Sequence, residues 1–502
     1  MKELKKRSAL FWITVGFVCV SVFFSGCREK TGGETTAPLI DAEILKSKLD
    51  LKSEEDPLIG GKISSGTFTV FENRNSLEGR TIKLTVIILH AFSETPKPDP
   101  FFPLAGGPGA DITQRVNGYK KSWIREERDI VFVSQRGTGG DNRLDCLLAA
   151  SDDNLQGYLD PLFNLDNFRV CLEELQENFD LTMYSTCMAA DDLNDLRLAL
   201  GYDKINLTGT SYGTRAALVY MRRHPETVRS AILNGVLPLA NKNPLFHSSS
   251  AQEAIQLLFA DCFENPECRF AFPNLENEFL TVLERLDEAP AGVLVDHPVT
   301  KERVLVNLDR ASFFEALRTM MYSYGRNRQV PYLIHQAFLG DYEPFAAAGV
   351  SSSRNIRRSL ALGMLLSVTC GEDLSRVTGE EIIRFTQGTF LGENRIRQQL
   401  AVCAFWPKSN IPDNYGDAVQ VDVPVLLLSG TMDPVTPPIW GTEAAGHLPN
   451  GLHLVVPGAH GVGGDCIRLI ETQFLESASI ENLDISCTNL IESRPYKVSG
   501  DR

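Results

Sequence analysis

Metal-binding spacings are absent from this chain of 502 residues. It has no C-x-x-C pair, and its eight histidines do not cluster with its eleven cysteines. Structural zinc sites usually show such pairs at short spacing, so we expect no zinc or other metal site. No internal repeat and no low-complexity tract is present either.

An excess of basic residues is also missing. The formal net charge is −15, with 49 lysines and arginines against 64 aspartates and glutamates. This balance argues against a nucleic-acid partner and against a basic face that docks on membranes. The hydrophobic fraction of 43% and the charged fraction of 23% are typical of a soluble globular protein. The length allows several domains, or one large α/β core with an insertion.

The N-terminal apolar run is shorter than the ~20 residues that a membrane-spanning helix needs. It covers residues 9–24, carries no charge, and follows the four basic residues Lys2, Lys5, Lys6 and Arg7. This pattern predicts a signal peptide over residues 1–26.

The run ends in Phe-Ser-Gly-Cys at residues 24–27, which resembles a bacterial lipobox. We therefore expect Cys27 to be lipidated, with residues 27–59 as a tether; ordinary signal cleavage and an uncleaved anchor are the alternatives. Arg28 stands where inner-membrane retention would need aspartate. The expected location is the bacterial cell envelope, on the periplasmic side of the outer membrane.

Nine cysteines follow Cys27, and in an exported chain they are more consistent with disulfides than with metal ligands. Cys262 and Cys268 are close enough in sequence to staple a turn. Two further pairs would brace an inserted region and tie down the C-terminal tail, namely Cys370 with Cys403 and Cys466 with Cys487. Nine is an odd number, so at least one thiol is left outside such pairs.

Strands and helices alternate through most of the chain. Residues 129–133 form a continuous apolar run typical of a buried parallel strand, and residues 189–200 have the apolar spacing of a helix. The alternation predicts an α/β fold, a mostly parallel sheet with helices on both faces. We place its two parts at 60–240 and 421–495, and a mostly helical cap at 241–420, where strand candidates are few.

A G-x-S-x-G pentapeptide stands at residues 209–213, between a predicted strand at 204–208 and a predicted helix at 214–223. Glycines on both sides of the serine let a tight turn push Ser211 out of line, as in a nucleophile elbow. A serine hydroxyl is a weak nucleophile without a base and a carboxylate that orients the base.

Two later loops supply these partners in the order Ser, Asp, His. Asp433 follows an apolar strand at 423–428, and His460 follows another at 452–456. Side chains at the carboxyl ends of parallel strands meet at one edge of the sheet, so we expect a Ser211-His460-Asp433 triad. Taken singly, Asp433 could be a turn cap and His460 a surface loop histidine.

An oxyanion intermediate needs backbone N–H donors. Tyr212 follows the nucleophile at a helix N-terminus, where negative charge is favoured. Gly106 and Gly107 lie in an early glycine-rich loop that allows close approach. We expect the amides of these residues to form the oxyanion hole; the alternative for the loop is a plain Gly/Pro turn.

Five motifs together resemble the proline iminopeptidase and tripeptidyl aminopeptidase family of α/β-hydrolases. They are the Gly-Gly-Pro-Gly loop at 106–109, Ser-Gln-Arg-Gly-Thr-Gly at 134–139, the elbow, the acid loop at 430–437, and Gly-Ala-His-Gly at 458–461. The resemblance implies an α/β-hydrolase fold, a C-terminal part of the tripeptidyl aminopeptidase type, and cleavage of short pieces from free peptide N-termini without a cofactor. Ala105 and Ser134 depart from the usual histidine and aspartate, which weakens any transfer of proline specificity.

In this family, acidic residues of the cap hold the substrate's ammonium group. The resemblance makes Glu372 and Asp373 the candidates, and an exposed acidic turn is the alternative. The predicted function is therefore a serine hydrolase acting on peptide N-termini, attached to the membrane only through its lipid. A carboxylesterase and a non-catalytic envelope lipoprotein are the competing hypotheses, and the oligomeric state stays open.

Overall fold

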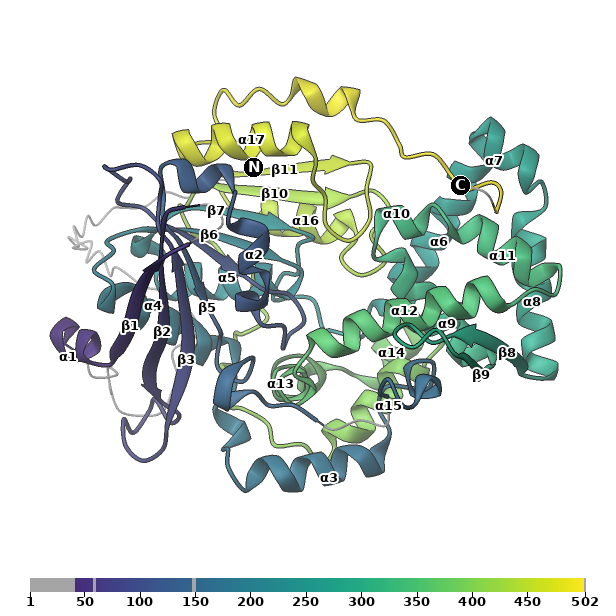
Figure 1. Cartoon of the computed structure of the whole chain (residues 1–502), viewed down its shortest axis with the longest axis horizontal. Coiled ribbons are helices and arrows are strands. Elements are labelled where there is room, and N and C mark those ends of the chain that lie inside the picture. Colours follow the sequence, from purple (N-terminus) through teal and green to yellow (C-terminus); the bar gives the residue numbers. More distant parts are fainter. Residues whose placement is uncertain (1–40, 57–59, 147–149, 501–502) are drawn as a thin grey trace, which may run out of the picture.

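A computed structural model describes residues 41–56, 60–146 and 150–500 of this chain (Figure 1). The predicted signal peptide and the lipidation site at Cys27 lie outside the described residues. Across the described segments, no helix has both the length and the apolar character needed to cross a membrane.

A nine-stranded sheet forms the centre of the core (Figure 1). Its strands, in sheet order, are β1 (Leu49–Glu55), β2 (Lys62–Phe71), β3 (Thr81–Leu89), β5 (Ile130–Val133), β4 (Phe101–Leu104), β6 (Ile205–Thr210), β7 (Val228–Asn234), β10 (Val425–Gly430) and β11 (Gly451–Val456). The first four strands pair antiparallel, and every pair from β5 to β11 is parallel. The sheet confirms the predicted α/β-hydrolase fold.

Helices cover both faces of the sheet. The core helices are α1 (Ala42–Ser47), α2 (Val116–Tyr119), α3 (Leu165–Gln176), α4 (Thr186–Ala199), α5 (Tyr212–Arg223), α16 (Pro438–Ala445) and α17 (Asp465–Ser477). On one face α4 and α5 pack in the largest apolar cluster, and on the other Ile467, Ile470 and Phe474 of α17 pack against β10 and β11. All six residues of β10 are buried, as expected of a central parallel strand.

A cap is inserted between β7 and β10. It contains α6 (His247–Glu264), α7 (Pro266–Ala271), α8 (Leu275–Glu288), α9 (Arg310–Met321), α10 (Tyr324–Asn327), α11 (Val330–Phe338), α12 (Glu343–Ser359), α13 (Leu362–Val368), α14 (Gly379–Thr386) and α15 (Asn394–Cys403). A hairpin of β8 (Ala291–Asp296) and β9 (Arg303–Leu308) interrupts the helices. The sequence did not predict it, although its buried residues alternate along both strands.

The cap has two parts with different packing. Helices α6 to α12 and the hairpin share an apolar cluster of their own, built around residues such as Phe279, Phe313 and Phe345. Helices α13 to α15 instead contribute Leu366 and Val402 to the cluster of the core. Helices α13 to α15 of the cap are therefore anchored on the core.

The core sheet begins earlier than the sequence predicted. Residues 41–55, assigned to the tether, contain α1 and β1, and β1 pairs along its length with β2. Leu45 of α1 is buried in the main cluster, which explains why this polar stretch is ordered. The prediction of a tether over residues 27–59 is thus wrong for residues 41–55.

Four disulfides brace the fold. They are Cys146–Cys171, Cys262–Cys268, Cys370–Cys403 and Cys466–Cys487. Three of these pairs were predicted, and the fourth joins two cysteines that the sequence left unassigned. Among the cysteines that the structure describes, Cys187 is the one outside the four bridges.

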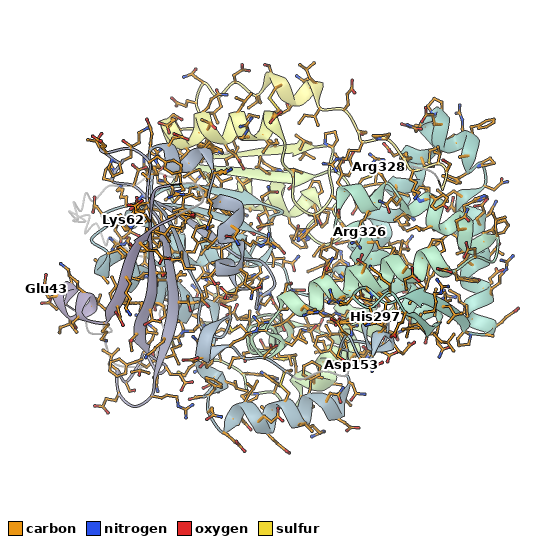
Figure 2. The ribbon with its side chains drawn as sticks, in the orientation of Figure 1. Glu43, Lys62, Asp153, His297, Arg326 and Arg328 are labelled. Carbon is orange, nitrogen blue, oxygen red and sulfur yellow. A yellow bond between two sulfur atoms is a disulfide. The ribbon has the colours of Figure 1, made fainter. Side chains whose placement is uncertain are left out.

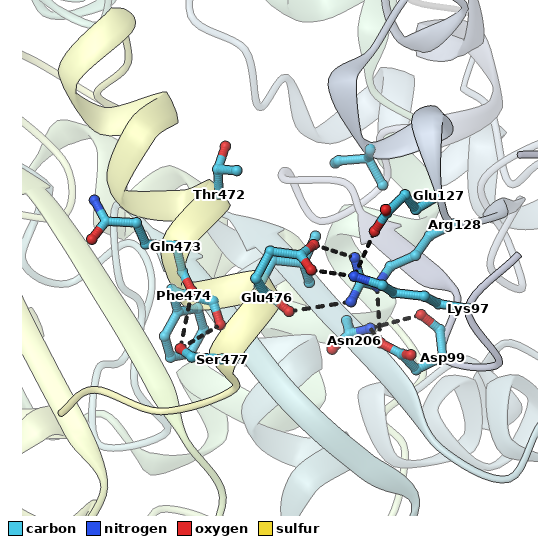
Figure 3. Close-up of polar contacts among 12 residues, drawn as sticks. Lys97, Asp99, Glu127, Arg128, Asn206, Thr472, Gln473, Phe474, Glu476 and Ser477 are labelled. Carbon is cyan, nitrogen blue, oxygen red and sulfur yellow. Dashed lines mark hydrogen bonds and ion pairs between the residues drawn. The ribbon is translucent and has the colours of Figure 1, made fainter. Parts of the chain in front are cut away.

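Helix α17 is fastened to the amino ends of the strands by a cluster of charges (Figure 3). Arg128 donates to Asp99 at 2.9 Å and to Glu476 of α17 at 2.6 Å, and Lys97 also pairs with Glu476. The side-chain amide of Asn206 on β6 donates to Asp99 at 2.8 Å. These contacts connect the helix to the strand that precedes Ser211.

The C-terminal tail crosses from the core to the cap (Figure 1). Cys487 ties its start to α17, and Tyr496 is buried in the cap cluster, where its hydroxyl donates to Asp261 at 2.7 Å. Arg328, labelled in Figure 2, stacks on the Tyr496 ring at 4.4 Å. The tail therefore links the two parts of the molecule outside the inserted chain.

Burial raises the pKa of Glu471, on α17, to about 7. Because this pKa is raised on folding, the unfolded chain ionises first, and stability falls as the pH rises from about 4.5 to about 7. We expect Glu471→Gln to match the wild type in Tm near pH 4.5 and to melt higher than the wild type near pH 8. Thermal unfolding across this range measures the gap.

The exposed Glu481→Gln is the control and should show no such divergence. A Tm difference for Glu471→Gln that stays constant with pH would contradict the assignment.

Candidate active site

Ser211 lies in the tight turn between β6 and α5. Its φ of 58° and ψ of −125° are rarely adopted by L-residues, and such strain is typical of a nucleophile elbow. A Cβ on Gly209 would lie 2.3 Å from the carbonyl oxygen of Gly213, and one on Gly213 would lie 2.3 Å from that of Leu104. Only glycine fits at these two positions, so the pentapeptide pattern is a steric requirement of this turn.

His460 and Asp433 form a hydrogen-bonded pair in the loops after β11 and β10. Nδ1 of His460 lies 2.9 Å from Oδ2 of Asp433 and 3.1 Å from Oδ1. Asp433 also accepts hydrogen bonds from the backbone N–H groups of Val435 and Thr436, both at 2.9 Å, and from the Thr436 hydroxyl at 2.7 Å. Its carboxylate is thereby held in one orientation.

Burial raises the pKa of Asp433, but His460 and the hydrogen bonds from Thr436 outweigh this effect and hold the pKa below its usual value. The carboxylate therefore stays ionised next to the imidazole. Nδ1 of His460 is occupied by Asp433, so Nε2 is the ring nitrogen that remains to act in the cavity. Ser211 and His460 both line that cavity.

The cap also contacts His460. The backbone N–H of His460 donates to the carbonyl of Tyr322, directly after α9, at 3.1 Å. The Tyr322 ring packs edge-on against the imidazole, with 5.1 Å between the ring centroids. The position of the imidazole thus depends on the docking of the cap as well as on the sheet.

Backbone of the predicted oxyanion loop passes beside Ser211. A Cβ on Gly106 would lie 3.2 Å from Cβ of Ser211 and 3.7 Å from its Oγ. Gly107 follows in the same loop and lines the cavity, and Tyr212 is the first residue of α5. The structure therefore brings all three predicted oxyanion residues to the serine.

A cavity of about 510 Å³ lies over Ser211. Its floor includes Gly106, Ser211 and His460 from the core. Its roof comes from α9, α12, α15 and the residues after α9, with Glu315, Arg318, Thr319, Tyr322, Arg357 and Arg395. A substrate must therefore fit between the sheet and the cap.

Two comparisons show proteins with sequences similar to this chain. A family model described as "TAP-like protein" matches residues 388–487. The chain is 28% identical over 330 residues to the serine protease Hip1 of Mycobacterium tuberculosis, with 61% of this chain and 62% of Hip1 covered. Residues 388–487 are thus similar to TAP-like proteins, and the chain has the α/β-hydrolase fold. The chain spans less than two thirds of the length of Hip1.

Solved structures show a weaker similarity. The proline iminopeptidase of Mycobacterium smegmatis is 14% identical, with a TM-score of 0.37, and the match covers 82% of this chain and 98% of that one. An esterase from Thermogutta terrifontis is 15% identical, with a TM-score of 0.32 and coverages of 82% and 92%.

The two acids predicted to bind the ammonium group do not line the cavity. Glu372 and Asp373 lie in a π-helical turn after α13 and are fully buried. Asp373 pairs with Arg215 at 2.7 Å. Glu372 accepts from the backbone N–H and the hydroxyl of Thr186, at 2.6 and 2.7 Å, and from the Tyr415 hydroxyl. The predicted substrate role is wrong here because both side chains are fully buried and neither lines the cavity.

These acids stabilise the region of the elbow instead. The hydroxyl of Thr186 lies 2.8 Å from the hydroxyl of Tyr212, so Glu372 connects the base of the cap to the residue after the nucleophile. Arg215, the partner of Asp373, lies one helical turn further along α5. The acidic pair thus joins cap and core.

Sequence reasoning missed the polar residues of the roof. Glu315 and Arg318 lie three residues apart on α9 and pair at 2.8 Å, and Arg395 lies on α15. The helical spacing of both segments is visible in the sequence, but nothing in it shows which face points toward Ser211. Among the residues of the described segments, no cluster of three or more His, Cys, Asp or Glu is arranged to hold a metal.

Gly106→Ala tests the close approach of the oxyanion loop. The new Cβ would press on the Thr210 carbonyl at 3.1 Å and on Ser211. We expect a loss of about 10²-fold in kcat on p-nitrophenyl acetate, because small displacements of reacting groups cost about that much, with little change in Tm. Steady-state kinetics with a melting curve measures both.

Gly118→Ala, in α2, is the matched control because a Cβ there meets no atom within 4 Å. Unchanged kcat in the Gly106 variant would contradict the proposed position of the loop.

Proposed function

We propose that this hydrolase removes one or a few residues from free peptide N-termini through an acyl-enzyme formed on Ser211. The observation that carries the proposal is the His460-Asp433 pair, with Nε2 of His460 left for the cavity that Ser211 lines. Neither fold nor cavity alone would indicate this chemistry, since the same fold hosts many functions.

In the first half-reaction Oγ of Ser211 attacks the acyl carbon while Nε2 of His460 takes its proton. Asp433, ionised and held by four donors, stabilises the imidazolium. The C–N bond then breaks, and His460 gives the proton to the leaving amine.

The negative charge that develops on the acyl oxygen needs donors already in place. The amide of Tyr212 at the start of α5, and an amide of Gly106 or Gly107, would supply them. Water then attacks the acyl carbon while His460 takes its proton. The bond between this carbon and Oγ breaks, the acid leaves, and His460 returns the proton to Oγ of Ser211.

Enclosure by the cap supports action on chain ends. A cavity of about 510 Å³ is of the size that holds a small ligand, and a short peptide end fits such a volume better than the middle of a long chain. Hip1, the relative, is named as a serine protease.

Glu315 is the candidate partner for the substrate's ammonium group. Among the cavity-lining residues that the structure describes, it is the only acidic one. Both of its hydrogen bonds to Arg318 use Oε2, at 3.2 and 2.8 Å, which leaves Oε1 for a ligand.

Export with a lipid anchor at Cys27 belongs to the same proposal. The basic residues and apolar run of residues 1–26 support it, and four disulfides are consistent with an oxidising compartment.

Substitution of the triad tests the mechanism. We expect Ser211→Ala to lower kcat by about 10⁴-fold or more and Asp433→Asn by about 10³- to 10⁴-fold, because the nucleophile and the orientation of its base act as one unit. The substrates are aminoacyl- and tripeptidyl-nitroanilides, their N-blocked forms, and short-chain nitrophenyl esters.

Ser477→Ala, at the end of α17, is the control. Loss of turnover on N-blocking supports exopeptidase action, and turnover of esters alone would favour a carboxylesterase. Equal inactivity of wild type and Ser211→Ala toward every substrate would contradict the proposal and favour a non-catalytic lipoprotein.

A further inference from the structure

Positive charge dominates the cavity above Ser211. Its charged lining side chains, apart from histidines, are Arg115, Glu315, Arg318, Arg357 and Arg395. Four guanidinium groups thus face one carboxylate, in a protein whose overall charge is negative. The excess is therefore local to the site.

The single carboxylate pairs with one of these guanidinium groups through Oε2, and its Oε1 is left for a ligand. Glu315 pairs with Nη2 of Arg318 at 2.8 Å, and Arg318 also donates to the Tyr322 hydroxyl at 2.7 Å. Burial raises the pKa of Glu315, but Arg318 and Arg395 outweigh this effect and lower it. Glu315 therefore stays ionised and is balanced by Arg318.

No carboxylate among the described residues forms an ion pair with Arg357 or Arg395. Arg357, on α12, donates to the backbone carbonyls of Gly157 and Asp160, which fix its side chain without cancelling its charge. Arg395 stacks on the Phe163 ring at 4.3 Å, and its buried Nε has no hydrogen-bond partner among the residues that the structure describes.

An arginine in this state is costly without an anion. Burial lowers the pKa of Arg395 to about 10, so the group is still charged at neutral pH. A half-buried guanidinium group without a carboxylate partner is poorly compensated, and an arriving carboxylate would pair with it. A small hollow of about 30 Å³, lined by Leu162, Glu315 and Arg395, adjoins this position.

We propose that Arg395, with Arg357 beside it in the cavity wall, forms a subsite for a carboxylate of the substrate, so that peptides with an acidic group are preferred. The effect of this subsite on catalysis rests on the proposed function, but a binding measurement is enough to detect the subsite. Guanidinium groups match carboxylates in shape and charge, and such hydrogen bonds are stronger than neutral ones. A lysine or arginine side chain of a substrate would meet repulsion here.

The carboxylate could belong to a Glu or Asp side chain or to the free C-terminus of a short peptide. Binding to the Ser211→Ala chain by calorimetry separates these sources. The ligands are alanine tripeptide amides with Glu or Gln at each of the three positions, and the Gln peptides with a free C-terminus.

We expect one of the carboxylate peptides to bind about tenfold to hundredfold more tightly than its neutral match, the range for a hydrogen bond to a charged group. In Ser211→Ala/Arg395→Gln this preference should fall to near unity. Arg397→Gln is the matched control: Arg397 lies on the same helix, is exposed, and pairs with Glu393 outside the cavity.

Equal affinity for charged and neutral peptides, or no binding of any carboxylate peptide, would overturn the subsite. A preference that survives Arg395→Gln would overturn the assignment to Arg395. If that variant does not fold, two other measurements test the proposal: the ratio of the affinities for Glu and Gln peptides in the Ser211→Ala chain, and the same ratio in the Arg395→Lys variant. A preference in binding without hydrolysis by the wild type would refute the proposed function and leave the subsite standing.

Discussion

The parallel half of the sheet is the constraint on which the candidate site depends. Strands β4, β6, β10 and β11 all run in one direction, so the residues after each strand reach the same edge. Ser211, Asp433 and His460 are far apart in the chain, and this pairing brings the loops that carry them to one edge of the sheet, where Ser211 and His460 line the same cavity. The buried Asp433 then fixes the imidazole, since its four donors leave the carboxylate one orientation.

The cap completes the site and sets its charge. Tyr322 contacts His460 through its carbonyl and its ring, while Glu372 and Asp373 fasten the base of the cap to α4 and α5. Because the cap encloses the serine, charges in its roof act in a medium of lower dielectric constant than water. In the proposed function, cap residues therefore select the substrate, and core residues carry out the chemistry.

The sequence predicted the elements that depend on local interactions. The elbow could be predicted because only glycine fits at 209 and 213, and the central strands could be predicted because buried parallel strands are continuously apolar. Long-range packing decided the rest. In the sequence, Glu372 and Asp373 resemble exposed acids, because nothing there shows that Thr186, Tyr415 and Arg215 contact them in the fold. The sequence also does not show which face of α15 points toward the cavity. The β8–β9 hairpin was missed because its short alternating runs lie among helical segments.

The central claim is that His460 and Asp433 activate Ser211. Intact-mass and peptide mass spectrometry after treatment with a fluorophosphonate test it most directly. The account predicts one adduct per chain, located on Ser211, which forms far more slowly in Asp433→Asn and His460→Ala. Absence of labelling, an adduct on another serine, or equal labelling rates in these variants would contradict it.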